Sequence, residues 1–184
     1  NNEYDGEEYD ARMELGGWTL PGYDDRSWAK AERTDIPTGV LTPQMTPGMK
    51  AEEVASALSV TPHGNGTHII DFGQNMAGWI SVIPKGKSGD TIRIRYAEKL
   101  TDDGTLYTAN LRDAKSEDIY VCNGQENAPW TPSFVYHGFR YVEVSGPVDY
   151  SKNSFKAYAV GDEMAGVGNF ACSDTLLNRI IHNA

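Results

Sequence analysis

The sequence contains few of the residues that usually form metal sites or reactive centres. It holds only two cysteines, Cys122 and Cys172, and neither lies at metal-ligand spacing from another cysteine or a histidine. The four histidines are scattered and form no helical metal pair. We therefore expect no metal centre of this kind. The cysteines either form one disulfide or remain buried free thiols, and we favour the thiols.

Long apolar runs and an excess of basic residues are also missing. No stretch approaches the roughly 18 apolar residues that mark a membrane-spanning helix. Sixteen Lys and Arg stand against 26 Asp and Glu, which gives a formal net charge of −10. Nucleic acids and anionic membranes bind clustered basic side chains. We expect neither as a partner, whereas a neutral ligand such as a sugar is compatible with this charge.

No stretch carries a complete catalytic motif. Gly86-Lys87-Ser88 resembles the end of a phosphate loop, but Ser81 stands where that motif needs glycine. Acidic pairs are frequent, yet neighbours on a strand point to opposite faces, whereas a glycosidase needs two carboxylates across one sugar. We interpret the pairs as solvated turns, with a calcium site as the alternative. They are Glu7-Glu8, Asp24-Asp25, Glu52-Glu53 and Asp102-Asp103.

What the sequence does contain is a β pattern from His68 onward. Apolar and polar residues alternate over Thr91–Tyr96, Phe139–Ser145 and Ser154–Val160, as in strands with one buried face. A short strand over 118–122 ends at Asn123-Gly124, which is a strong signal for a two-residue hairpin. Short strands separated by turn signals predict a mainly β fold, an antiparallel β-sandwich.

The stretch Asp71–Trp79 lies between two apolar strand segments. Gly73 and Gly78 bracket polar residues, and glycine allows a positive φ angle or a close backbone approach. We expect a fixed corner between strands that is not a hairpin.

The regions on either side of this β pattern differ from it. Three prolines predict an extended connector over Asp35–Met49, and Ala51–Leu58 fits a short helix or an edge strand. Near the other end, Ser173 or Asp174 can cap a short C-terminal helix. Its apolar residues share one face and need a partner, either the sandwich or a further domain. They are Leu176, Leu177, Ile180 and Ile181.

The candidate carbohydrate-binding residues are Tyr9, Asp10, Arg12 and Trp18. Aromatic rings offer apolar faces to a sugar, and the Asp and Arg side chains offer acceptors and donors to its hydroxyls. The alternative is that these residues cap the edge of the sandwich. We interpret His137 as a packing histidine at a strand bend, and no residue is predicted to be catalytic or to bind a metal.

Several stretches together resemble the bacterial α-L-rhamnosidases of glycoside hydrolase family 78. They follow the order of that family and span nearly the whole chain. The stretches are Tyr9–Arg12 with Gly17-Trp18, Pro21–Asp25 with Trp28, Asp71–Trp79, Leu106–Arg112, Tyr136–Val144 and Phe170–Ser173.

The resemblance implies a jelly-roll or concanavalin-like sandwich in a modular, inverting enzyme that removes terminal α-L-rhamnose. Its catalytic acids would lie in an (α/α)6 barrel with no counterpart in this sequence. Residues 1–60 would be the end of a preceding sandwich plus a connector, and 61–162 a β-sandwich domain. Residues 163–184 would be a linker and the first helix leading to the barrel.

The resemblance also implies the partners, a rhamnose-containing carbohydrate and the barrel. We expect a non-catalytic segment without a cofactor, calcium in a sugar-binding sandwich being the exception. The alternatives are a working carbohydrate-binding module and an interdomain scaffold. The compartment, exported or cytoplasmic, stays open.

Overall fold

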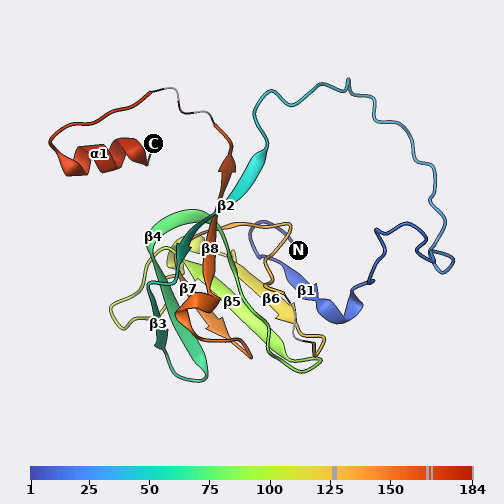
Figure 1. Ribbon diagram of the computed structural model, residues 1–184, viewed down its shortest axis with the longest axis horizontal. Helices are drawn as coiled ribbons and strands as arrows, with labels where there is room; N and C mark the ends of the chain where they lie inside the picture. Colours follow the sequence, from blue (N-terminus) through green and yellow to red (C-terminus); the bar gives the residue numbers. More distant parts are fainter. Residues whose placement is uncertain (126–127, 165, 167, 184) are drawn as a thin grey trace.

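The computed structural model describes residues 1–125, 128–164, 166 and 168–183 (Figure 1). The strands are β1 (Glu8–Asp10), β2 (Met49–Ser56), β3 (Ser59–Pro62), β4 (Thr67–Ser81), β5 (Thr91–Ala97), β6 (Glu117–Val121), β7 (His137–Ser145) and β8 (Lys156–Asp162). The helices are the 3-10 turns η1 (Ala11–Met13), η2 (Ala109–Leu111) and η3 (Lys152–Ser154), and α1 (Thr175–His182). The mainly β fold with one short C-terminal helix is confirmed.

The strands form one eight-stranded sheet in the order β1-β6-β5-β7-β4-β8-β2, with β3 paired to β4 outside this path. Among the described strands, only β1 and β6 pair in parallel. Figure 1 shows the sheet curled on itself, so that its layers enclose the core. Strands from both the first 60 residues and the later part of the chain therefore share one sheet.

The alternation expected in β5 is confirmed by burial. Ile92, Ile94 and Tyr96 are fully buried in the core. Between them, Arg93 and Arg95 point outward and pair with acidic side chains of the neighbouring strands β6 and β7. A period of two thus puts one face of the strand in the core and leaves the other for cross-strand ion pairs.

The corner expected at Asp71–Trp79 is wrong, because this stretch lies inside the single strand β4. Asp71 pairs with Tyr141 and Met76 with Phe139, so residues 72–75 lie opposite Arg140 alone. The strand therefore bulges rather than turns. Gly73 has a φ of 80°, and its N–H donates to Asp71 Oδ1 at 2.6 Å, which fixes the bulge.

The hairpin expected at Asn123-Gly124 is also wrong. β6 pairs with β5 and β1, and the next strand of the chain, β7, lies on the other side of β5. Just after β6, Cys122 instead exchanges backbone hydrogen bonds with Gly89 and Asp90, which lie in the loop before β5. A local turn signal cannot reveal that the chain crosses over a neighbouring strand.

After η1 the chain leaves the sheet, and it rejoins the sheet at β2. The expected extended connector is present up to residue 48, and the chain reaches far out from the sheet there (Figure 1). Val40, Leu41 and Met45 on it are almost fully exposed. The ambiguous stretch that follows is the strand β2, which pairs with β8 along the edge of the sheet.

The helix α1 begins at Asp174, one of the two residues expected to cap it. Oδ1 of Asp174 accepts from the backbone N–H groups of Leu176 and Leu177 at 2.9 and 3.2 Å. All four apolar side chains of this helix are exposed. Among the described residues, no helix is long and apolar enough to cross a membrane.

Both cysteines are free thiols. Cys122 is buried, and burial raises the pKa of its thiol. Cys172 is exposed, so the burial expected for it is wrong. It lies just ahead of α1, in a part of the chain that does not contribute to the core.

Candidate functional site

Tyr9 on β1 packs against the aromatic side chains of the sheet edge. Its ring stacks on Tyr120 of β6, with centroids 5.8 Å apart, and lies 6.0 Å from Trp130. The parallel register, which pairs Tyr9 with Tyr120, produces this contact. The Tyr9 hydroxyl donates to Glu14 Oε1 at 2.6 Å. Burial, followed by this carboxylate, raises the pKa of Tyr9 to about 12.

We predict that Glu14→Gln lowers the pKa of Tyr9 from about 12 towards its ordinary 10.0, with burial still holding it above that value. A phenol whose pKa is higher in the folded chain stabilises the fold below the unfolded pKa, and this stabilisation is lost as pH rises towards the folded pKa. The parent chain should therefore lose this contribution between pH 10.0 and about 12. Tyrosine-ring NMR measures the titration, with Tyr9→Phe to assign the signal. An unchanged pKa in Glu14→Gln would contradict the role of the carboxylate.

Asp10 and Arg12 are bound to each other. Asp10 Oδ1 accepts from the backbone N–H and Nε of Arg12 at 3.0 and 2.8 Å, and Oδ2 accepts from Nη2 at 2.7 Å. These hydrogen bonds hold the pKa of Asp10 below its usual value. The pair caps η1, so these two side chains are oriented by each other at the start of this turn.

Tyr9 and Trp18 line one open hollow of about 650 Å³, which we call the Tyr9 hollow. The Trp18 ring lies 6.2 Å from Trp28, which tilts towards it. The structure thus brings together two of the four predicted residues and adds Trp28 and Glu14, which were not among them. The lining is Tyr9, Met13, Glu14, Leu15, Gly16, Gly17, Trp18, Thr19 and Trp28. The sequence signal for Trp28 was its place with Pro21–Asp25 in the family resemblance.

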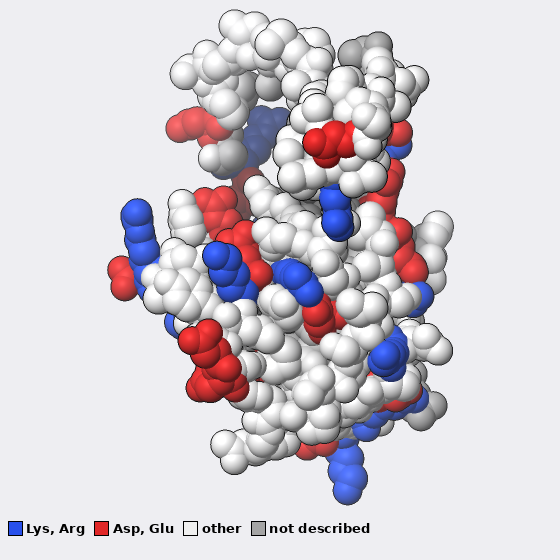
Figure 2. Space-filling model, turned by 90° about the vertical axis from the view of Figure 1, so that its left-hand side faces the viewer, with Lys and Arg blue, Asp and Glu red and all other residues white. Residues whose placement is uncertain are grey.

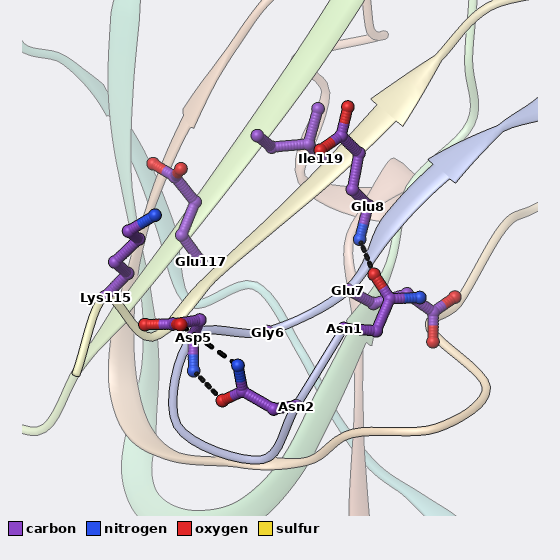
Figure 3. Close-up of a pocket in the computed structure, with 9 residues that line it drawn as sticks. All are labelled: Asn1, Asn2, Asp5, Gly6, Glu7, Glu8, Lys115, Glu117 and Ile119. Atoms are coloured by element: carbon purple, nitrogen blue, oxygen red, sulfur yellow. Dashed lines mark hydrogen bonds between the residues drawn. The ribbon is translucent and has the colours of Figure 1, made fainter.

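A smaller hollow of about 200 Å³ lies beside the first residues of the chain (Figure 3). Asn2 donates to Asp5 Oδ2 at 3.0 Å, and this bond lowers the pKa of Asp5. The Glu8 N–H donates to Asn1 Oδ1 at 2.8 Å. The remaining lining residues are Gly6, Glu7, Lys115, Glu117 and Ile119. The hollow is small and polar, and its hydrogen bonds shape the first turn of the chain.

Glu7 corrects the interpretation of Glu7-Glu8 as a solvated pair. Its side chain is 2% exposed, and its Oε2 accepts from the backbone N–H groups of Ser133 and Phe134, both at 2.9 Å. Oε1 has no partner among the described residues. Neighbouring residues of an extended chain point to opposite sides, so Glu8 is exposed whereas Glu7 ties the loop before β7 to the N-terminal segment.

The other acidic pairs are exposed, as expected, but Glu52-Glu53 lies within the strand β2, where a turn was expected. Within the described part of the chain, no group of three or more His, Cys, Asp or Glu residues is arranged to hold a metal ion.

A buried polar cluster surrounds Asp118 on β6. Asp118 Oδ1 accepts from the Glu7 N–H at 2.9 Å and lies 3.1 Å from His137 Nε2, and Oδ2 accepts from the Tyr96 hydroxyl at 2.8 Å. The Tyr96 ring stacks on the imidazole at 4.1 Å. Burial and the Asp118 carboxylate raise the pKa of Tyr96 well above its ordinary value. The cluster links the N-terminal segment to three strands.

The same cluster contains Ser, His and Asp within hydrogen-bonding distance of one another, but all three are buried away from any substrate. Ser116 Oγ lies 3.2 Å from His137 Nδ1, and both residues are buried together with Asp118. A nucleophile must reach its substrate, and Ser116 is only 6% exposed. His137 therefore packs in the core, as the sequence interpretation expected.

Two domain families match this sequence. The bacterial α-L-rhamnosidase concanavalin-like domain matches residues 61–161, and the α-L-rhamnosidase N-terminal domain matches residues 1–53. An α-L-rhamnosidase from Streptomyces avermitilis is 45% identical over 143 residues, which make up 77% of this chain and 14% of that protein. One from Formosa agariphila is 34% identical over 100% of this chain and 20% of that protein.

Solved structures agree with these matches. The structure of α-L-rhamnosidase from Dictyoglumus thermophilum has a TM-score of 0.91 and 37% identity, over 100% of this chain and 21% of that chain. That of the Streptomyces avermitilis enzyme complexed with L-rhamnose has a TM-score of 0.89 and 37% identity, over 99% of this chain and 18% of that chain. The chain thus spans about a fifth of the length of these relatives or less. Because the concanavalin-like domain alone matches more than half of its residues, this chain belongs to the bacterial α-L-rhamnosidase family.

Proposed function

We propose that this chain is a non-catalytic β segment of an α-L-rhamnosidase, which supports a catalytic (α/α)6 barrel located elsewhere in a longer protein. The observation that carries the proposal is the coverage: 77% and 100% of this chain align with only 14% and 20% of two curated relatives. The division into residues 1–60, 61–162 and 163–184, the last leading to the barrel, is part of this proposal. The exposed apolar face of α1 fits such a role, because it needs a covering surface.

The electrostatics of the carboxyl groups support the proposal. A glycosidase needs one carboxyl group whose pKa is raised, so that it can protonate the leaving oxygen. Six aspartate carboxyl groups instead have a pKa held below its usual value, namely Asp5, Asp10, Asp24, Asp71, Asp103 and Asp149. Hydrogen bonds from neighbouring side chains or backbone N–H groups cause these shifts, which keep the carboxylates ionised.

Turnover of p-nitrophenyl α-L-rhamnopyranoside by the purified chain tests this proposal. We expect no release of nitrophenol above the protein-free rate. Fractions across two successive, chemically different columns are assayed, because a contaminating host glycosidase would separate from the chain. Turnover that follows the protein peak through both columns would overturn the proposal.

A second candidate function is carbohydrate binding in the Tyr9 hollow. The observation that favours it is the pairing of two exposed tryptophan rings, Trp18 and Trp28, with the Glu14 carboxylate in one concave surface. A relative with 37% identity has been solved in complex with L-rhamnose, which makes this sugar the natural probe. Such a module would hold rhamnose-containing carbohydrate near the enzyme.

Titration with L-rhamnose, followed by tryptophan fluorescence, tests the second candidate. We expect Trp18→Ala to abolish the change, since it removes a ring of the hollow. Arg12→Ala should leave it intact, because Arg12 is bound to Asp10 and does not line the hollow. Equal loss in both variants would favour the original four-residue site. No fluorescence change in the parent chain would exclude the candidate.

A further inference from the structure

A second open hollow, distant in sequence from the Tyr9 hollow, lies where three separate stretches meet. They are the bulge of β4, the residues that follow β5 and the centre of β7. The hollow has a volume of about 510 Å³, and we call it the Glu98 hollow. Its lining is Asn75, Glu98, Lys99, Leu100, Arg140 and Tyr141. The bulge places Asn75 at this surface, and bulges often re-aim side chains beside binding sites.

One side of the hollow offers oriented donors. Arg140 Nε and Nη2 donate to the two Asp71 oxygens, each at 2.9 Å, and hold the pKa of Asp71 below its usual value. The guanidinium carbon also lies 4.8 Å from the Tyr141 ring centroid. A guanidinium has five N–H groups, and these two bonds to Asp71 leave further N–H groups for a ligand. The planar group is thus fixed in place before any ligand binds.

The other side offers oriented acceptors. Glu98 Oε1 accepts from Asn75 Nδ2 at 2.8 Å, and Oε2 accepts from Asn110 Nδ2 of η2 at 3.4 Å. These amides come from two distant parts of the chain and fix the plane of the carboxylate. Each carboxylate oxygen has two lone-pair sites, so each can accept one more hydrogen bond. Glu98 is exposed and able to do so.

We propose that the Glu98 hollow binds a neutral, hydroxyl-rich ring of the size of a pyranoside. Neighbouring sugar hydroxyls both donate and accept, which matches an oriented carboxylate opposite an oriented guanidinium. Leu100 and the edge of Tyr141 supply apolar contact. The Glu98 carboxylate would repel an anionic ligand, and the Arg140 guanidinium would repel a cationic one. Figure 2 shows acidic and basic side chains interspersed over one face of the molecule.

Amide NMR of the whole 184-residue chain tests the proposal. Separate titrations use methyl α-L-rhamnopyranoside, methyl β-D-galactopyranoside, methyl α-D-glucopyranoside and calcium chloride. We expect at least one glycoside to shift the signals of Gly73, Asn75 and Glu98 with a dissociation constant of about 1 mM. Glu98→Gln keeps the size of the side chain but removes its charge, and should weaken binding about tenfold.

The matched control is Glu32→Gln, the same chemical change at an exposed position between η1 and β2. It should bind like the parent chain, and both variants should keep the dispersed spectrum of the folded sheet. Three results would overturn the proposal: no glycoside shifts these signals, both variants bind alike, or calcium alone shifts them. Shifts confined to Tyr9 and Trp18 would also overturn it while supporting the Tyr9 hollow. The rhamnoside turnover assay is independent of all these outcomes.

Discussion

Asp118→Ala is expected to destabilise the chain by about 3 kcal/mol or more, because three buried polar groups lose their acceptor at about 1–3 kcal/mol each. The carboxylate has no exposed surface and holds the Glu7 N–H, the Tyr96 hydroxyl and His137 Nε2. The substitution leaves these groups buried without their acceptor, and an unpaired buried polar group keeps its full desolvation cost. Urea denaturation followed by tyrosine and tryptophan fluorescence measures the loss.

The control for this prediction is Asp102→Ala, at an exposed turn. It should change the free energy of unfolding by about 0.5 kcal/mol at most. Tyr96→Phe removes one bond of the same cluster and should cost about 1 kcal/mol. A loss below about 1 kcal/mol for Asp118→Ala would show that the cluster does not hold the N-terminal segment to the sheet.

Gly78→Ala should be about as severe, at about 3 kcal/mol or more, for a steric reason. Gly78 lies in β4 between its partners His137 of β7 and Ala159 of β8. A Cβ there would stand 1.8 Å from the Tyr158 carbonyl oxygen. Because that neighbour is backbone in a paired strand, it cannot move without opening the ladder. Thermal and urea unfolding measure the effect.

Gly161→Ala in the adjacent strand β8 is the matched control. A Cβ at this position meets no atom within 4 Å. The substitution should be neutral or stabilise by about 0.5 kcal/mol, since alanine reduces the entropy of the unfolded chain. Equal stability of the two variants would contradict the close approach of β4 and β8.

The local parts of the fold were predictable from the sequence. The alternation over Thr91–Tyr96 predicted a strand with one buried face, and Ile92, Ile94 and Tyr96 are fully buried. Asp174 predicted the start of α1, because capping depends only on the next three residues. The stretch Asp71–Trp79 was recognised as special, but its glycines serve a bulge and the close approach of β8 instead of a corner.

The candidate sites were less predictable. Asp10 and Arg12 have the chemistry to bind a sugar, yet their side chains bind each other. Trp28 lines the Tyr9 hollow, although it was not among the four predicted residues. Glu98 attracted no notice in the sequence, since its two amide donors stand 23 and 12 residues away.

By itself the sequence determined the mainly β class, the α-L-rhamnosidase resemblance and the capped helix, all of which depend on short periods or ordered motifs. Only the tertiary structure decided which polar groups are occupied and which are open, as for Glu7 in the core and Glu98 at the surface. The physical reason is register. Strand pairing brings residues from distant stretches within hydrogen-bonding reach, and a shift of one residue would turn each side chain to the other face.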